Sequence, residues 1–132
     1  MVSNTGLGDD FIWANDGNDR INAGDGNDFI SGGDGDDLIH GGAGVDSVDG
    51  GAGHDTFLFN PTDAAVRIDL RPGQVNTGAA AGESYIGIEA IIGTNSADFF
   101  IAGLGQTLFA AGGAGRDTFV AKPGATVVAL GG

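Results

Sequence analysis

The chain has 132 residues, of which 27 are glycine and none is cysteine, and its formal charge is -13. This length indicates a single domain, and the absence of cysteine leaves metal ions as the alternative to disulfides for stabilising a small fold. The acidic balance argues against partners such as nucleic acid or anionic membrane surfaces and favours small cations. Membrane insertion is not expected either, because no run of about 18 apolar residues occurs.

Six consecutive nonapeptides fill residues 5–58. The fourth residue of each unit is glycine, the sixth is aspartate and the eighth is apolar. Three columns that hold through six units indicate a repeat architecture. The same stretch contains 12 Asp and one basic residue, Arg20, so it carries most of the negative charge. The units read TGLGDDFIW, ANDGNDRIN, AGDGNDFIS, GGDGDDLIH, GGAGVDSVD and GGAGHDTFL.

Each unit predicts a turn followed by a short strand. Glycines at the second and fourth positions allow positive φ, so the first six residues are expected to form the turn. The last three residues alternate polar, apolar and polar side chains, which is typical of a half-buried strand. Each turn reverses the chain, so two units close one coil. The predicted fold is all-β: a parallel β-roll, or β-solenoid, with two nonapeptide repeats per coil around a thin apolar core.

Stacked coils would align the sixth-position aspartates into two columns. At a strand spacing of about 4.8 Å, neighbouring carboxylates repel each other by a few kcal/mol per pair. A hard divalent cation between turns removes this repulsion, and Ca²⁺ suits such a site better than Mg²⁺ because it accepts six to eight oxygens in flexible geometry. Asn18 and Asn27 would add neutral oxygen ligands. One column contains Asp10, Asp28 and Asp46, and the other contains Asp19, Asp37 and Asp55.

The six units resemble the GGxGxDxUx nonapeptide of the repeats-in-toxin (RTX) family, a calcium-binding β-roll of secreted bacterial proteins. The resemblance implies that each Ca²⁺ lies between a turn and the turn two repeats later, bound by sixth-position Asp and turn carbonyls. It implies about four interior sites, with further partial sites at the ends. The first two units depart from the pattern at Thr5, Ala14 and Asn15, and Val45 and His54 are atypical fifth residues, so weaker end sites are expected. The implied ligands are the six aspartates and the turn glycines Gly8, Gly17, Gly24, Gly26, Gly33, Gly35, Gly42, Gly44, Gly51 and Gly53.

Residues 59–132 are expected to continue and cap the roll as irregular β structure within the same domain. Strands are predicted at 66–70 and 85–92, with a turn at Pro72–Gly73. The nonapeptide form returns at 93–100 and 112–119, which makes Asp98 and Asp117 secondary ligand candidates. Their separation exceeds two repeats by one position, which predicts a single slip in register, and Thr107 falls where an acid is expected. Six phenylalanines should thicken the core in and after the last repeat: Phe57, Phe59, Phe99, Phe100, Phe109 and Phe119.

Other kinds of site fit this sequence less well. An EF-hand requires a Glu at its twelfth position, and residues 5–58 contain no Glu. His40 and His54 occupy different repeat positions without a partner His or Cys, which favours a surface role. Outward-facing Phe11 and Trp13 would form a small sugar-stacking platform or pack against a neighbouring domain or coil. No catalytic set of residues is apparent, so the chain is not expected to be an enzyme.

The resemblance implies a folding switch coupled to export. A thin core cannot offset chain entropy and the repulsion of the array, so the calcium-free array should be disordered and calcium should fold it. In the RTX family this folding follows type I secretion and stabilises the parent protein. The expected location is therefore extracellular or on the cell surface, reached through the type I secretion machinery without an N-terminal signal, and the expected state is a monomer. Two alternatives share the fold: a carbohydrate-binding module of a secreted polysaccharide-modifying enzyme, and a structural or adhesive segment of a surface protein.

Overall fold

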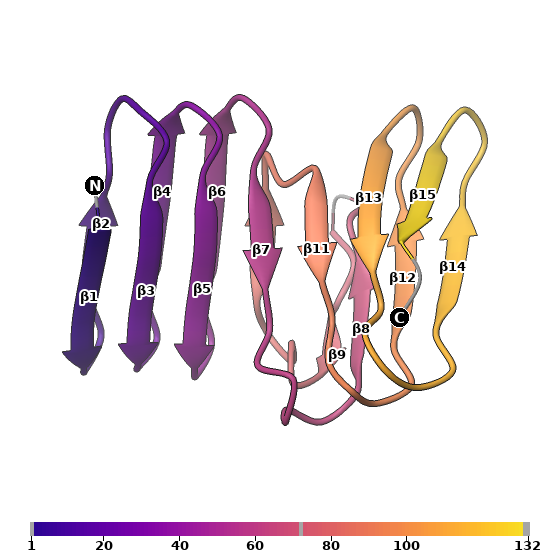
Figure 1. Cartoon of the computed structure of the whole chain (residues 1–132), viewed down its shortest axis with the longest axis horizontal. Coiled ribbons are helices and arrows are strands. Elements are labelled where there is room, and N and C mark those ends of the chain that lie inside the picture. Colours follow the sequence, from indigo (N-terminus) through magenta and orange to yellow (C-terminus); the bar gives the residue numbers. More distant parts are fainter. Residues whose placement is uncertain (1, 72, 131–132) are drawn as a thin grey trace. The chain divides into compact units, whose positions relative to one another are not determined.

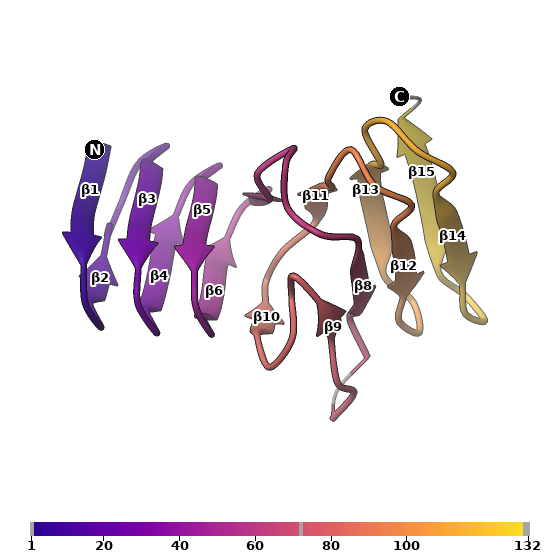
Figure 2. The ribbon, with the colours of Figure 1, turned by 90° about the horizontal axis from the view of Figure 1, so that it is seen from below.

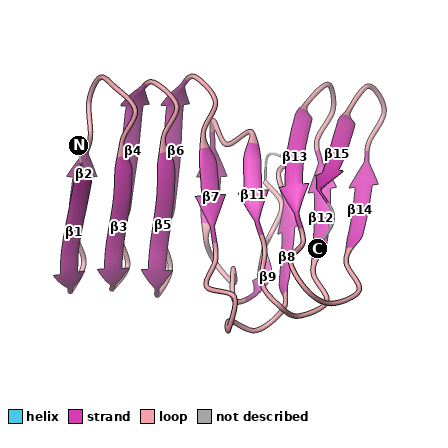
Figure 3. Cartoon of the chain, viewed as in Figure 1, coloured by secondary structure: helices cyan, strands magenta, loops and turns pink. Residues whose placement is uncertain are grey.

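The computed structural model describes residues 2–71 and 73–130. These residues form strands and turns and no helix (Figure 3). The described part of the chain therefore has no helix that could cross a membrane. The strands are mostly parallel and coil as a β-solenoid, which confirms the predicted fold class. The chain divides into two compact units. The first unit comprises the residues up to Leu58 together with Glu83–Ala90, and the second comprises Phe59–Gly82 and the residues from Ile91 onward.

The first unit contains two parallel ladders, seen as two layers in Figure 2. Its strands alternate between the ladders along the chain (Figure 1). Ile21 pairs with Ile39 and Ile30 with Val48, so each residue lies beside its equivalent two repeats later, which confirms two nonapeptides per coil. One ladder contains β1 (Val2–Leu7), β3 (Arg20–Asp25), β5 (Leu38–Ala43) and β7 (Thr56–Leu58). The other contains β2 (Phe11–Trp13), β4 (Phe29–Asp34), β6 (Ser47–Ala52) and β10 (Ser84–Ile86).

The long strands of this unit extend beyond the predicted strand segment. They begin at the seventh position of one repeat and end at the third position of the next, as in β5. The start of the next repeat continues the ladder, since Gly24 pairs with Gly42 at the second position and Asp25 with Ala43 at the third. The prediction that the turn fills the first six positions was therefore wrong. The turn consists of the fourth to sixth positions, and the eighth-position side chains form the core as predicted.

Close stacking of coils explains the glycine at the second position. Gly42 has φ +106, and a Cβ on it would lie 1.8 Å from the carbonyl oxygen of Gly24. Only glycine permits this backbone contact between equivalent positions of neighbouring coils. Asn15 occupies a second position with φ +76, the one non-glycine residue with positive φ within 2–71 and 73–130, and Asn tolerates this conformation better than most residues.

The second unit contains shorter and less regular strands. The predicted strand at 66–70 is confirmed as β8, whereas the one at 85–92 is divided into β10 and β11 because Gly87 turns the chain with φ +61. At the predicted turn Pro72–Gly73, Pro72 lies outside the described residues and Gly73 has φ +76. One sheet contains β8 (Val66–Asp69), β9 (Thr77–Gly78), β12 (Phe99–Ala102) and β14 (Thr118–Ala121). In addition, β13 (Thr107–Ala111) pairs with β15 (Thr126–Leu130). The strand β11 (Ala90–Ile92) begins at the last residue of the first unit and continues into the second.

The core of the second unit is aromatic, as predicted. Phe100 is fully buried and its ring stacks on Phe119 with 5.4 Å between centroids. Phe59 is also buried, whereas Phe99, Phe109 and Phe119 are half-buried. Phe57 is buried too, but it belongs to the first unit. Phe99 pairs with Thr118, one position beyond two full repeats, which confirms the predicted slip in register. This unit therefore relies on larger apolar side chains than the Ile and Val of the array.

Candidate metal centre

The six sixth-position aspartates lie where each turn enters the next strand, and five of them are buried to 2% exposure or less. Their Oδ1 atoms link successive coils. In four of the aspartates the N–H donates to the Oδ1 of the Asp two repeats later, so backbone and carboxylate alternate along both columns. The four bonds are Asp10 to Asp28 (2.8 Å), Asp28 to Asp46 (3.0 Å), Asp19 to Asp37 (2.8 Å) and Asp37 to Asp55 (2.8 Å).

The second carboxylate oxygens are in a different situation. Within the described part of the chain, the buried Oδ2 atoms of Asp10, Asp28, Asp37, Asp46 and Asp55 accept no hydrogen bond. A buried acceptor without a partner costs about 1–3 kcal/mol, and more when it is charged. Because these oxygens recur at equivalent turns, their environment fits a hard cation that binds carboxylate oxygen. The residues present therefore suit calcium.

The first-position glycines leave space for these Oδ2 atoms. A Cβ on Gly32 would lie 2.2 Å from Asp37 Oδ2 and 2.5 Å from the carbonyl oxygen of Gly50. A carboxylate oxygen and a carbonyl oxygen of the next coil thus converge on one small space. Gly41 has the same relation to Asp46, again at 2.2 Å. These glycines were not among the predicted ligands, although their presence at first positions without positive φ is a signal of close approach in the sequence.

The electrostatics of the columns are unfavourable without a cation. The pKa of Asp46 is raised, mainly by burial. The hydrogen bond from the Asp28 N–H opposes this increase, and the negative charge of the Asp28 carboxylate adds to it. Burial also raises the pKa of Asp55, and the carboxylates of Asp37 and Glu89 add to this effect. Raised carboxyl pKa values mean that the folded protein disfavours the charged form, which a bound divalent cation would stabilise.

The fifth positions form a second hydrogen-bond ladder. Asn27 Oδ1 accepts the N–H of Val45 at 2.9 Å, and Asn18 Oδ1 accepts the N–H of Asp36 at 2.9 Å. Asp9 and Asp36 accept in the same way from the fifth residue of the coil above. Asn and Asp are thus equivalent here as acceptors. The Asn18 and Asn27 oxygens predicted to be neutral ligands are used to join coils.

The predicted glycine ligands lie at the second position of a repeat, within a strand, or at the fourth position, in the turn. The N–H of Gly8 donates to the carbonyl of Asp25 at 2.7 Å, and that of Gly26 to Ala43 at 2.8 Å. Among the described residues, no three His, Cys, Asp or Glu side chains converge as a conventional metal cluster. A site here would instead combine two carboxylates from one column with backbone carbonyls. All ten glycines have positive φ: Gly8, Gly17, Gly24, Gly26, Gly33, Gly35, Gly42, Gly44, Gly51 and Gly53.

Asp98 and Asp117 occupy sixth positions in the second unit, and the N–H of Asp98 donates to Asp117 Oδ1 at 3.0 Å. Asp98 differs from the array because its Oδ2 accepts the N–H of Thr94 at 2.7 Å. Its Oδ1 also accepts from the Val66 N–H and the Thr94 hydroxyl, both at 2.9 Å. Donors from Thr94 and Val66 therefore satisfy the Asp98 carboxylate, whereas each array carboxylate named above has an oxygen without a donor within the described residues.

Thr107 does not stand where an acid is expected. It is the first residue of β13 and pairs with Thr126. The preceding residue, Gln106, occupies the turn position, and its Oε1 accepts the N–H of Gly103 at 2.8 Å. The acid position was predicted one residue too late in the chain, because this degenerate repeat reaches that position earlier than a full nonapeptide would. A neutral amide replaces the carboxylate there.

The structure also brings together residues that the sequence analysis assigned elsewhere. Glu89, expected within a strand, accepts the N–H of Asp55 through Oε2 at 2.8 Å, and Glu83 is buried beside Tyr85. The signal in the sequence is an acid two positions before a large apolar side chain, as in the repeats, but the two acids are closer together than a nonapeptide. Both glutamates belong to the first unit.

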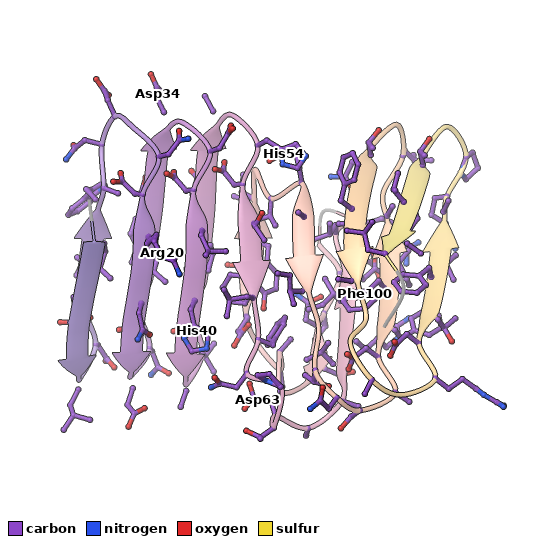
Figure 4. The ribbon with its side chains drawn as sticks, in the orientation of Figure 1. Arg20, Asp34, His40, His54, Asp63 and Phe100 are labelled. Carbon is purple, nitrogen blue, oxygen red and sulfur yellow. The ribbon has the colours of Figure 1, made fainter. Side chains whose placement is uncertain are left out.

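Polar and aromatic side chains on the outer faces lie apart from the columns. His40 Nδ1 lies 3.0 Å from Asn22 Oδ1 on the outer face of the ladder, and Figure 4 shows His40 and His54 on different parts of the unit. Phe11, Trp13 and Phe29 form an exposed aromatic cluster with centroid distances of 5.8–6.1 Å. The prediction that Phe11 and Trp13 face outward is confirmed.

Residues 4–30 and 22–57 match the family model of the RTX calcium-binding nonapeptide repeat. The matched residues are those that contain the two aspartate columns. No curated protein and no solved structure matches the chain significantly.

Proposed function

From the RTX calcium-binding repeats of residues 4–57, we propose that this chain is a calcium-binding module whose first unit folds when calcium binds. The observation that supports this most directly is the set of buried Oδ2 atoms that lack a hydrogen bond within the described residues. Each Ca²⁺ would lie between two aspartates of one column, with turn carbonyls completing its oxygen shell. When bound, calcium supplies the positive charge that the columns lack.

The role of the chain's own residues in this switch follows from their placement. The Oδ1 atoms fix the distance between coils through the backbone N–H groups. The first-position glycines exclude side chains from the space beside Oδ2. Because the folded array already joins its coils in this way, calcium mainly removes the repulsion that opposes folding, and its binding free energy becomes folding free energy.

Folding that depends on calcium suits a protein exported as an unfolded chain. RTX proteins are typically secreted, and we extend this to the chain as a proposal: it remains unfolded where calcium is scarce and folds in the extracellular medium. In this proposal the chain passes through a type I secretion channel, stabilises its parent protein and has no catalytic role of its own.

The test is a calcium titration of chelator-treated protein followed by far-UV circular dichroism, with magnesium as the control. The proposal expects a cooperative transition from coil to β structure with calcium and none with magnesium at the same concentration. If the chelated protein already had its full β signal and calcium changed nothing, the proposal would be rejected.

The exposed aromatic cluster supports one second candidate function, binding of a carbohydrate by stacking on Phe11, Trp13 and Phe29. Calcium-loaded protein would be titrated with neutral oligosaccharides while Trp13 fluorescence is recorded, and Trp13→Ala serves as the variant for calorimetry. A null titration of the loaded protein would reject this function without affecting the calcium proposal.

A further inference from the structure

The segment Glu83–Ala90 forms a turn of the first unit although it lies outside the repeats. β10 pairs in parallel with β6, with Ser84 opposite Ser47. The N–H of Ser84 donates to the Asp46 carbonyl at 3.0 Å, just as the N–H of Ser47 donates to the Asp28 carbonyl at 2.8 Å. Glu83, which precedes Ser84, therefore occupies the sixth position in the column of Asp28 and Asp46.

Glu89 stands in the same relation to the other column. The N–H of Ala90 donates to the Asp55 carbonyl at 2.9 Å, as the N–H of Thr56 donates to Asp37 at 2.8 Å. Glu89 Oε2 accepts the Asp55 N–H at 2.8 Å, the same distance at which Asp55 Oδ1 accepts the Asp37 N–H. Backbone and side chain of Glu89 thus both repeat the pattern of an array aspartate.

The backbone of the segment also reproduces the space beside Oδ2. A Cβ on Gly50 would lie 2.2 Å from the Gly87 carbonyl oxygen and 2.6 Å from Asp55 Oδ2. At Gly32, one coil earlier, the corresponding oxygens belong to Gly50 and Asp37. Gly87 therefore brings a carbonyl to the place that a nonapeptide carbonyl occupies within the array.

The last aspartate of each column has an oxygen that no hydrogen bond satisfies within the described residues. Asp46 is 1% exposed and Asp55 is fully buried, and the Oδ2 of each lacks a hydrogen-bond donor. These oxygens lie at the end of the array that Glu83 and Glu89 cover. Glu is longer than Asp by one methylene, which lets a carboxylate reach the column from a turn that is not a nonapeptide.

We propose that Glu83 and Glu89 are the terminal calcium ligands of the two columns, so that each column gains one Ca²⁺ beyond the sites between its aspartates. This inference rests on the proposed function. One ion is held by Asp46 and Glu83, and the other by Asp55, Glu89 and the Gly87 carbonyl. Tyr85 orients the first site, because its hydroxyl donates to Glu83 Oε2 and its ring packs edge-on against Phe57 at 4.9 Å.

Calcium stoichiometry from native mass spectrometry tests both sites. Glu83→Gln and Glu89→Gln keep side-chain size and an oxygen acceptor but lose the charge that calcium requires, so each is expected to hold about one ion fewer than the parent chain and the double variant about two fewer. Asp34→Asn is the matched control, because Asp34 is an exposed acid of the same unit whose side chain points away from the ribbon (Figure 4). It should keep the parent stoichiometry.

Terbium luminescence gives a second readout for the Glu83 site, which does not depend on counting ions. Trp13 and Tyr85 are the single Trp and Tyr of the chain, so in a Trp13→Phe background Tyr85 is the one efficient sensitiser. Tb³⁺ prefers the same hard oxygen ligands as Ca²⁺, and Tyr85 beside the site should transfer energy to it. Adding Glu83→Gln should weaken this Tyr-sensitised binding about tenfold or more, whereas Tyr85→Phe should abolish the emission because it removes the sensitiser.

The outcomes separate the two proposals. Suppose that the unsubstituted chain binds calcium and that both Gln variants bind the same number of ions with the same affinity. Glu83 and Glu89 are then not ligands, and the inference is overturned while the proposed sites of the array remain. If the parent chain binds no calcium, the proposed function fails, and this inference fails with it. Loss of an ion in each Gln variant but not in Asp34→Asn supports both.

Discussion

The two oxygens of each sixth-position aspartate have separate roles. Oδ1 accepts a backbone N–H from a neighbouring coil, and Oδ2 is buried beside a first-position glycine. An amide side chain would preserve the first role and remove the charge needed for the second. Substitution by Asn therefore separates coil stacking from calcium binding.

Asp37→Asn is predicted to weaken calcium binding at two neighbouring sites, since Asp37 lies between Asp19 and Asp55 in its column. The calcium midpoint of folding should rise about tenfold or more because the ligand charge falls. Without calcium the variant should be no less ordered than the unsubstituted chain, because a buried charge has been removed. Circular dichroism during calcium titration measures both effects. Asp34→Asn is the control, and an equal rise in its midpoint would show that only net charge matters.

Asp69 and Arg71 give the second unit a pH-dependent contact. Hydrogen bonds from Arg71 hold the pKa of the buried Asp69 carboxyl below its usual value, with Nη2 to Oδ2 at 2.5 Å. Since the folded pKa is lower than the unfolded one, this contact stabilises the fold above the unfolded pKa of about 4 and is lost as pH falls through the folded pKa.

Arg71→Met is predicted to raise the pKa of Asp69 and to destabilise the second unit near neutral pH, because a buried carboxylate loses its charged partner. Carboxyl-carbon NMR of the calcium-loaded protein would follow the titration of Asp69. Arg67→Met is the control, since Arg67 contributes the smallest of the effects on Asp69 and its guanidinium lies over the Phe99 ring at 5.2 Å. An unchanged pKa of Asp69 in Arg71→Met would contradict the assignment.

At the scale of the element, a turn of the array is defined by backbone contact between coils. Gly6 and Gly42 occupy the same repeat position with φ of +99 and +106, but only at Gly42 does a Cβ meet the coil below. No atom lies within 4 Å of a Cβ on Gly6. The two positions therefore share conformational strain and differ in steric contact.

Gly42→Ala is predicted to prevent formation of the regular ladder between β3 and β5, whereas Gly6→Ala should cost only about 1–2 kcal/mol for its left-handed backbone. The calcium midpoint should rise strongly in Gly42→Ala and slightly in Gly6→Ala, as measured by circular dichroism. Equal effects would mean that φ alone, and not contact between coils, requires glycine.

At the scale of the whole molecule, charge and core are distributed differently between the two units. The array combines most of the acids with a core of Ile and Val. The second unit buries Phe100, Ile68 and Leu108, and its own backbone N–H groups donate to Asp98. Removal of calcium should therefore affect the units unequally.

Hydrogen exchange with and without chelator tests this expectation. Amides of β3 to β6 should lose protection when calcium is removed, while those of β8 and β12 should keep more of theirs, because aromatic burial does not depend on the metal. Magnesium in place of calcium should not restore the array. Complete loss in both units on chelation would indicate a single cooperative unit instead.

The nonapeptide spacing by itself determined the parallel coil, the two aspartate columns and the suitability for calcium, because a fixed period places the same residue at the same point of every coil. It also predicted the single slip in register between Asp98 and Asp117. Where the period ends, sequence spacing stops indicating which residues become neighbours.

Only the tertiary structure decided the remaining features. Glu83 and Glu89 join the columns because the intervening loop returns the chain to the array, and the contact between Asp55 and Glu89 follows no repeat period. The separate roles of Oδ1 and Oδ2 likewise depend on which backbone N–H groups the folded chain brings near each side chain. The same is true of Gln106, which occupies the turn position predicted for Thr107. Hydrogen bonds and burial are properties of three-dimensional proximity, which the repeat specifies within the array and not beyond it.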